Sequence, residues 1–233
     1  MSALLEARGL RKVFAGGDGQ PLDVLRGVEV DVHRGEFVAI VGASGAGKST
    51  LLHLLGALDR PTGGDVWLDG SRYADLDGTA LAELRNRKLG FVFQFHHLLR
   101  EFSALENVMM PLLIGGTAAR PARSRAEEVL SLVGLAGRMT HRPSELSGGE
   151  QQRCAVARAL VHDPGVVLAD EPSGNLDHAN ADRLHDVFFR LAREYETAVV
   201  VVTHNRQLAG RADRILMLED GRVTAVGSVD AIP

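Results

Sequence analysis

A glycine-rich segment that ends in a lysine and two hydroxyl residues specifies chemistry most directly in this sequence. It reads GASGAGKST and fits the pattern G-x-x-x-x-G-K-[S/T]. Glycines allow the backbone to curl so that successive N–H groups point inward at phosphate oxygens, and a helix after the loop adds the positive end of its dipole. We therefore expect a phosphate loop formed by Gly42, Ala43, Ser44, Gly45, Ala46, Gly47, Lys48, Ser49 and Thr50.

Two side chains of the phosphate loop have separate predicted roles. Lys48 should reach the β and γ phosphates of a bound nucleotide and support catalysis, and Ser49 should ligate Mg²⁺, which prefers oxygen ligands. A glycine-rich turn without function is the alternative. The apolar strand before the loop and the apolar helix after it favour nucleotide binding, so ATP and Mg²⁺ are the expected ligands.

The elements that must position this loop begin with four short segments that are almost wholly apolar. They are residues 37–41, 91–93, 166–169 and 198–202. Such segments are typical of strands buried on both faces of a sheet. Between them lie longer stretches with helical spacing, which predict crossover helices: residues 49–58, 151–161 and 181–193. The sequence therefore predicts an α/β fold with a mainly parallel sheet.

Polar residues follow three of these strands, and parallel strands would bring them together beside the γ phosphate. Asp170 should hold the Mg²⁺ shell, and Glu171 should polarise the attacking water. His204 should donate to the γ phosphate, and Gln94 should contact Mg²⁺ or the water. Solvated strand ends are the alternative for each residue alone, whereas their combination with the phosphate loop favours function.

A second candidate phosphate site lies in the segment LSGGEQQ at residues 146–152, which we call the signature segment. Ser147 and Glu150 have the spacing of a capping box, so a well-capped helix is the plain alternative. A capping box needs no glycine, however, and Gly148 with Gly149 would leave bare N–H groups for an anion. One γ phosphate cannot easily be held by both helix N-termini of one chain, so we expect a head-to-tail dimer of two copies with ATP at the interface.

Two further regions flank the predicted sheet. The first 35 residues together with residues 65–69 alternate like antiparallel strands, and residues 103–161 look helical with a break at 115–123. We expect one domain over residues 1–233, with a nucleotide-binding core and β lobe at 1–94 and 162–233. A helical lobe would occupy residues 95–161.

Composition excludes several classes of protein. The chain has 233 residues, a formal net charge of −4 and a pI of about 6.1, which argue against a nucleic-acid partner. Glu6 and Arg8 interrupt any export signal, and no run of about 18 apolar residues predicts a membrane-spanning helix. The single Cys154 is expected to be a buried core residue without a disulfide.

These motifs occur in the order found in ABC transporter ATPase subunits, which the chain resembles over essentially its whole length. The resemblance implies a P-loop NTPase (RecA-like) core with an inserted helical lobe. It also implies that Ser147 to Gly149 face the partner's ATP and that Asn175 to Asp177 link the two sites. In members of this family, an aromatic residue near the N-terminus stacks on adenine, and Phe14 stands at the matching position. The alternative is that Phe14 is a core residue.

A closer resemblance links residues 83–116 and the sequence HRPSELSGGE to the ATPase of the lipoprotein-releasing system of Gram-negative bacteria. Arg100 and Ser103 depart from that pattern, where Pro and Thr are commoner. The resemblance implies release of outer-membrane-directed lipoproteins and a peripheral place on the cytoplasmic face of the inner membrane. It also implies integral membrane permease subunits that contact residues 94–100.

Other functions remain open at this point. An ATPase of a macrolide-exporter-like or cell-division-like system would carry nearly the same nucleotide motifs, and a small-molecule importer ATPase is harder to exclude. A soluble DNA-repair ATPase is disfavoured because no long coiled coil separates the two phosphate motifs. His96 and His97 are interpreted as surface or contact residues, and the arginines within 120–125 as a solvated loop.

Overall fold

The central sheet contains all four predicted buried strands. The structure, a computed structural model, describes residues 3–17 and 19–227, so residues 1–2, 18 and 228–233 of the predicted domain lie outside the described residues. Strands of the sheet follow the order β10-β9-β3-β8-β7-β6. They are β3 (Phe37–Val41), β6 (Leu89–Phe93), β7 (Val166–Asp170), β8 (Ala198–Val202), β9 (Arg214–Glu219) and β10 (Arg222–Val226). All neighbours pair in parallel except β10, which is antiparallel to β9, so the α/β prediction is confirmed.

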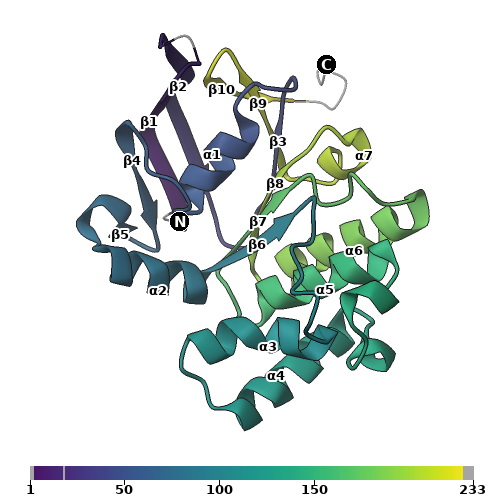
Figure 1. The fold of residues 1–233 in the computed structure, drawn as a ribbon. Helices are drawn as coiled ribbons and strands as arrows, with labels where there is room; N and C mark the ends of the chain where they lie inside the picture. The colour runs from purple at the N-terminus through teal and green to yellow at the C-terminus, as the bar shows by residue number, and fades with distance from the viewer. Residues whose placement is uncertain (1–2, 18, 228–233) are drawn as a thin grey trace.

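The sheet is apolar because it has a core on each face. Phe37, Ala39 and Val41 of β3 belong to one apolar cluster, and Val38 and Ile40 belong to the other. Since side chains alternate along a strand, a fully apolar strand of this kind serves both clusters at once. Helix α1 (Lys48–Leu55) covers one face, and α5 (Gly148–Leu160) and α6 (His178–Glu194) cover the other (Figure 1).

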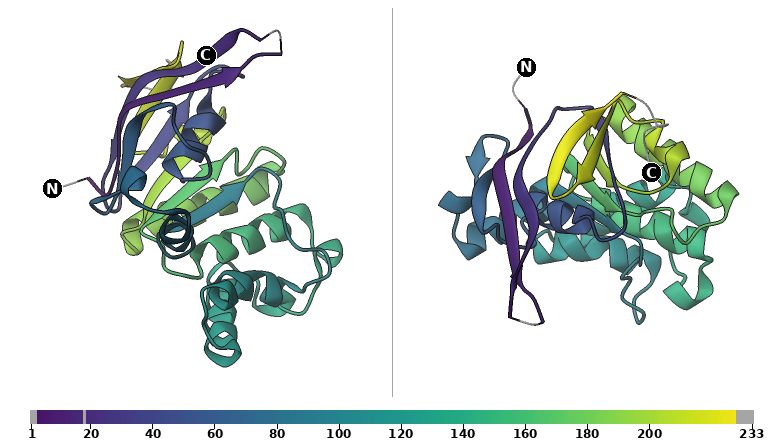
Figure 2. Two further views of the ribbon diagram at one scale, coloured as in Figure 1. Left: turned by 60° about the vertical axis from the view of Figure 1, so that its left-hand side comes forward. Right: turned by 90° about the horizontal axis from the view of Figure 1, so that it is seen from above.

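An antiparallel sheet forms the predicted β lobe. Its order is β2-β1-β4-β5, with β1 (Leu5–Ala15), β2 (Pro21–Val32), β4 (Gly63–Leu68) and β5 (Ser71–Arg72). Helix α1 lies between this sheet and the central one, as the two views of Figure 2 show. The 3₁₀ turn η1 (Tyr73–Asp75) and helix α2 (Gly78–Lys88) lead from the β lobe back to β6.

The helical lobe lies on the opposite side of the central sheet. It contains α3 (Ala104–Ile114), α4 (Ala119–Leu132), η2 (Ala136–Arg138), η3 (Pro143–Glu145) and the start of α5; a short α7 (Arg206–Ala209) follows β8. Cys154 of α5 is fully buried in this lobe. No helix among the described residues is long and apolar enough to cross a membrane. The division into a core at 1–94 and 162–233 and a helical lobe at 95–161 stays a prediction.

One local prediction is wrong. The break expected at 115–123 ends at residue 118, so the arginines of 120–125 lie on α4 rather than in a loop. Pro121 does not delay the helix because it occupies the first turn, where its missing N–H would have no intrahelical partner. Arg123 bonds Glu127 of the same helix, with 2.8 Å between nitrogen and oxygen, and Arg125 pairs with Glu128 in the same way.

Candidate functional site

The phosphate loop connects β3 to α1, as predicted. Gly47 forms the N-cap of α1 in a left-handed conformation, with φ of 98°, and no side chain caps the helix. A Cβ atom on Gly47 would lie 2.7 Å from Val24, whereas one on Gly45 would meet nothing within 4 Å. Packing therefore requires glycine at position 47, and the open side at position 45 leaves the backbone free to approach an anion.

Lys48 is held over its own loop. Its Nζ donates to the carbonyl oxygens of Gly42 and Ala43, at 2.8 and 2.9 Å. A cavity of about 470 Å³ lies beside the loop, between residues 43–46, β2 and the β9–β10 turn. The cationic amine of Lys48 and the uncapped N-terminus of α1 adjoin the loop itself, and these groups fit the phosphates of a nucleotide.

Glu171 is the most constrained polar residue at this edge of the sheet. Its carboxylate accepts hydrogen bonds from the backbone N–H of His204 at 3.0 Å, from Thr203 Oγ1 at 3.2 Å, and contacts His204 Nδ1 at 2.8 Å. Its backbone has φ of 43°, which is unusual for a residue with a side chain. Strain of this kind often accompanies a functional site, and here the end of β8 holds the carboxylate in place.

Asp170 and Gln94 end neighbouring strands of the sheet. Asp170 is the last residue of β7, and Gln94 follows β6, whose Phe93 lies in register with Asp170. Gln94 Nε2 donates to Asn175 Oδ1 at 3.2 Å, and Asn175 Nδ2 donates back to the Gln94 carbonyl at 3.3 Å. The structure therefore joins Gln94 to the loop SGNLD at residues 173–177.

Two polar residues of this region were missed by sequence reasoning. Thr203 is buried and bonds Glu171, and buried Gln152 donates from Nε2 to the carbonyl of Phe93 at 3.1 Å. The only sequence feature that could have indicated a role for Thr203 is its position directly before His204. Gln152 belongs to the signature segment but acts on a strand that lies 59 residues earlier, which no local pattern can indicate.

Phe14 lies near the end of β1, in the β lobe. Its side chain is 40% exposed, and the Lys12 ammonium lies 4.9 Å from the centre of its ring. Because this side chain is too exposed to belong to the core, the alternative of a core phenylalanine is disfavoured.

The first turn of α5 is capped where that of α1 is not. Ser147 Oγ accepts from the N–H of Glu150 at 3.3 Å, and the carboxylate of Glu150 accepts from the N–H of Ser147 at 2.8 Å. The Arg138 guanidinium 2.8 Å away, helped by the Ser147 N–H, lowers the pKa of Glu150 to about 2. The plain alternative, a capped helix, is thus present together with the two glycines.

These two glycines differ in their surroundings. A Cβ on Gly149 would lie 2.5 Å from the Asn180 side chain, so internal packing requires that glycine. A Cβ on Gly148 would meet nothing within 4 Å. The signature segment begins α5, whereas the phosphate loop begins α1, and these two helices pack in different apolar clusters on opposite faces of the central sheet, so the two candidate phosphate sites lie apart within one chain.

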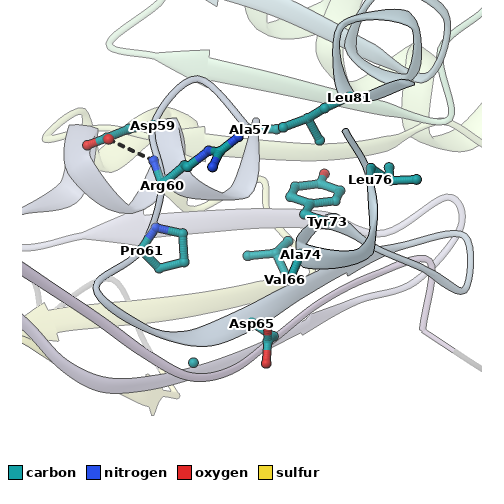
Figure 3. Close-up of a pocket in the computed structure, with 11 residues that line it drawn as sticks. Ala57, Asp59, Arg60, Pro61, Asp65, Val66, Tyr73, Ala74, Leu76 and Leu81 are labelled. Carbon is teal, nitrogen blue, oxygen red and sulfur yellow. Dashed lines mark hydrogen bonds between the residues drawn. The ribbon is translucent and has the colours of Figure 1, made fainter. Parts of the chain in front are cut away.

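A separate cavity of about 270 Å³ lies where α1 leads into β4 and η1, away from the predicted site residues (Figure 3). Asp59 at its edge pairs with Lys12 at 2.7 Å, and Tyr73 donates its hydroxyl to the Leu55 carbonyl at 2.9 Å. The Asp59 and Tyr73 side chains of this cavity are therefore satisfied within the chain.

Residues 25–174 match the family model described as ABC transporter. A lipoprotein-releasing system ATP-binding protein LolD from Geobacter metallireducens is 54% identical over 225 residues, which cover 97% of this chain and 100% of that protein. LolD from Pseudomonas syringae pv. tomato is 55% identical, over 95% of this chain and 97% of that protein.

Solved structures of ATP-binding cassettes have the same fold. A dimeric bacterial ABC transporter cassette, MJ0796, has a TM-score of 0.87 at 39% identity and covers 94% of this chain and 96% of its own. A dimeric post-hydrolysis state of the same cassette, bound to ADP and Pi, has a TM-score of 0.88 at 38% identity, over 97% of this chain and 98% of that one. The expected fold, a P-loop core with a β lobe and a helical lobe, is confirmed.

Proposed function

The chain belongs to the ABC transporter family and is an ATP hydrolase of that family; from this premise we propose that it powers the release of lipoproteins from a membrane. The observation that carries the ATPase assignment is the Glu171 carboxylate, fixed by His204 and Thr203 at the strand ends that adjoin the phosphate loop. The cargo rests on the printed names of relatives that are more than half identical to this chain.

Hydrolysis follows from the placement of these side chains. The phosphate loop and Lys48 bind and orient the triphosphate, and Glu171 holds the attacking water in line with the γ phosphate. The backbone N–H of His204 keeps the Glu171 carboxylate in place, which leaves the ring N–H to donate to the phosphoryl oxygens once a nucleotide is bound. Ser49, Asp170 and Gln94 would hold Mg²⁺, which supplies neutralisation of phosphate charge when it is bound. Phosphoryl transfer needs little beyond this alignment and charge stabilisation.

We further propose that two copies pair head to tail, with the signature segment of one copy against the γ phosphate bound by the other. The separation of the two candidate phosphate sites within one chain supports this, as do the dimeric cassettes that share the fold. Gly148 supports it as well, because its backbone faces open space where a partner's anion could approach.

A groove beside α2 and β6 supports docking of permease subunits. It has a volume of about 320 Å³ and is lined by Leu58, Arg85, Phe91, Phe93, Pro111 and Arg158, among others. Phe95 and Ile114 are 65% and 73% exposed, and further exposed apolar side chains are Leu99, Phe102 and Leu113. Exposed apolar side chains of this kind are typical of protein interaction sites. We place the chain peripherally on the cytoplasmic face of the inner membrane.

The test is purification of the tagged full-length chain from detergent-solubilised membranes and identification of the proteins that co-elute. Lipoprotein-release membrane subunits are the expected result. A macrolide-type or cell-division permease would keep the ATPase and contradict the cargo. Recovery of no membrane protein would contradict the transporter assignment.

A further inference from the structure

The segment that follows Gln94 is fixed to the helical lobe through its backbone. We call residues 95–102 the docking loop. Arg158 donates from Nη1 to the His97 carbonyl at 2.7 Å and from Nη2 to the His96 carbonyl at 2.8 Å. Burial lowers the pKa of the Arg158 guanidinium, and no carboxylate pairs with it in the part of the chain that the structure describes. The two carbonyls therefore solvate the charge of Arg158.

The other end of the docking loop is fixed in the same manner. The side chain of Asn107, which is fully buried, donates to the carbonyls of Leu99 and Phe102 at 3.1 Å and accepts from the N–H of Leu99 at 2.8 Å. His97 has φ of 48°, a strained conformation that such anchors can maintain. The backbone of the loop is thus bound to the lobe, while Phe95 and Leu99 are exposed.

Arg158 and the signature glycines lie on one rigid element. Helix α5 begins at Gly148, and ten residues of helix place Arg158 about 15 Å further along the axis. Arg158 lines the groove beside Phe93, so a protein docked there would contact the same side chain that holds the loop.

We propose that Arg158 is a positioning residue that couples the docking loop to the signature segment. By clamping the His96 and His97 carbonyls to α5, it makes the loop and the helix N-terminus move as one body. Docking of a membrane subunit then displaces the surface that meets the ATP of the second copy. This inference rests on the proposed function, whereas the clamp itself does not depend on the identity of the partner.

The first measurement is hydrogen exchange on the full-length chain, in Arg158→Met and Arg158→Lys. Methionine keeps the length of the side chain without its donors, and lysine keeps the charge without the two-pronged geometry. We expect exchange to become about tenfold faster in Arg158→Met, in the docking loop and in residues 148–151 together, because a hydrogen bond to a charged group is lost. The exchange rates of Arg158→Lys should lie between those of Arg158→Met and the wild type. This variant serves as the test if Arg158→Met does not fold.

The second measurement is the ratio of ATPase rates with and without the membrane subunits that co-purify with the wild type. We expect this ratio to fall about tenfold in Arg158→Met. Arg123→Met, which breaks an exposed ion pair on α4, is the matched control and should keep both the ratio and the exchange pattern.

The two hypotheses fail in different ways. Faster exchange in the docking loop alone, with residues 148–151 and the stimulation ratio unchanged, would mean that Arg158 only stabilises the loop, and the coupling proposal would be wrong. A wild-type chain that no membrane subunit stimulates contradicts the proposed function, and the exchange experiment still decides whether the clamp exists.

Discussion

Helices α1 and α5 both begin at glycine-rich segments, yet their first turns are built differently. Helix α1 starts at a left-handed Gly47, with no capping side chain and no acidic residue in its first turn. Helix α5 has a complete capping box, and its Glu150 adds a negative charge that Arg138 offsets. An anion finds bare donors at α1, whereas at α5 it meets donors that are already partly used.

This contrast suggests that α1 alone can hold a nucleotide and that α5 contributes only once a phosphate is already held opposite it. Substitutions at the α1 end of the sheet should therefore affect binding and chemistry within one chain. Substitutions at α5 should affect association of two chains.

The largest expected effect is that of Glu171→Gln. Glutamine keeps the size of the side chain but cannot accept a proton, so ATP hydrolysis should slow by about 100-fold to 10,000-fold while ATP binding persists. An ATP-dependent dimer should accumulate, which size-exclusion chromatography with and without ATP would reveal. Normal turnover in this variant would remove Glu171 from its assigned role.

Lys48→Ala should weaken nucleotide binding itself. Loss of a charged donor to the phosphates should raise the dissociation constant for ATP by roughly 10-fold to 100-fold, measured by calorimetry on the isolated chain. Lys88→Ala is a useful control, because that exposed lysine pairs with Asp69 instead. Equal losses in the two variants would point to general destabilisation.

Gly148→Asp tests the α5 half directly. An aspartate in the first turn suits a helix N-terminus, and its Cβ has open space, so the fold should be retained. ATP should bind as in the wild type, whereas ATP-dependent dimerisation should weaken by about tenfold because the new charge repels the partner's phosphate. Gly149→Ala should instead lower thermal stability, since its Cβ would clash with Asn180. Unimpaired dimerisation of Gly148→Asp would contradict the head-to-tail arrangement.

The smallest effect is a dependence of stability on pH through Glu150. Its pKa is about 2 in the folded chain against an ordinary value of 4.5, so its stabilisation is complete above pH 4.5 and is lost as the pH falls towards 2. Wild type should exceed Glu150→Gln in unfolding free energy by about 1 kcal/mol at pH 6, and the gap should close on acidification. Denaturant titrations at several pH values measure this, and a gap independent of pH would argue against the Arg138 pairing.

Contiguous patterns predicted the fold well where both faces of an element are buried. Residues 37–41 and 198–202 match β3 and β8 at both ends, because their five positions are all apolar and buried. The capping-box spacing of Ser147 and Glu150 predicted the start of α5 at 148, whereas apolar periodicity alone begins only at 151, because the first turn consists of glycines and a capping glutamate. The start of α4 at Ala119 was not predicted, because Pro121 indicated a break although proline is tolerated in the first turn of a helix.

The candidate site shows the same difference between features that are local in sequence and features that are not. Residues of the phosphate loop and the strand ends were predicted as site residues because each lies in a local motif. The contacts that fix them were not predictable: Thr203 reaches Glu171 across 32 positions, and Arg158 reaches His97 across 61. Such pairs depend on which strands and helices become neighbours in three dimensions.

Burial of Cys154 has a practical consequence for labelling experiments. Its thiol is fully enclosed, and burial raises its pKa to about 12, so almost none of it is thiolate at neutral pH. Alkylating reagents and spin labels should therefore ignore it in the folded protein. The natural chain already serves as a silent background, in which a single cysteine introduced at an exposed position can report the distance between two copies through each step of nucleotide turnover.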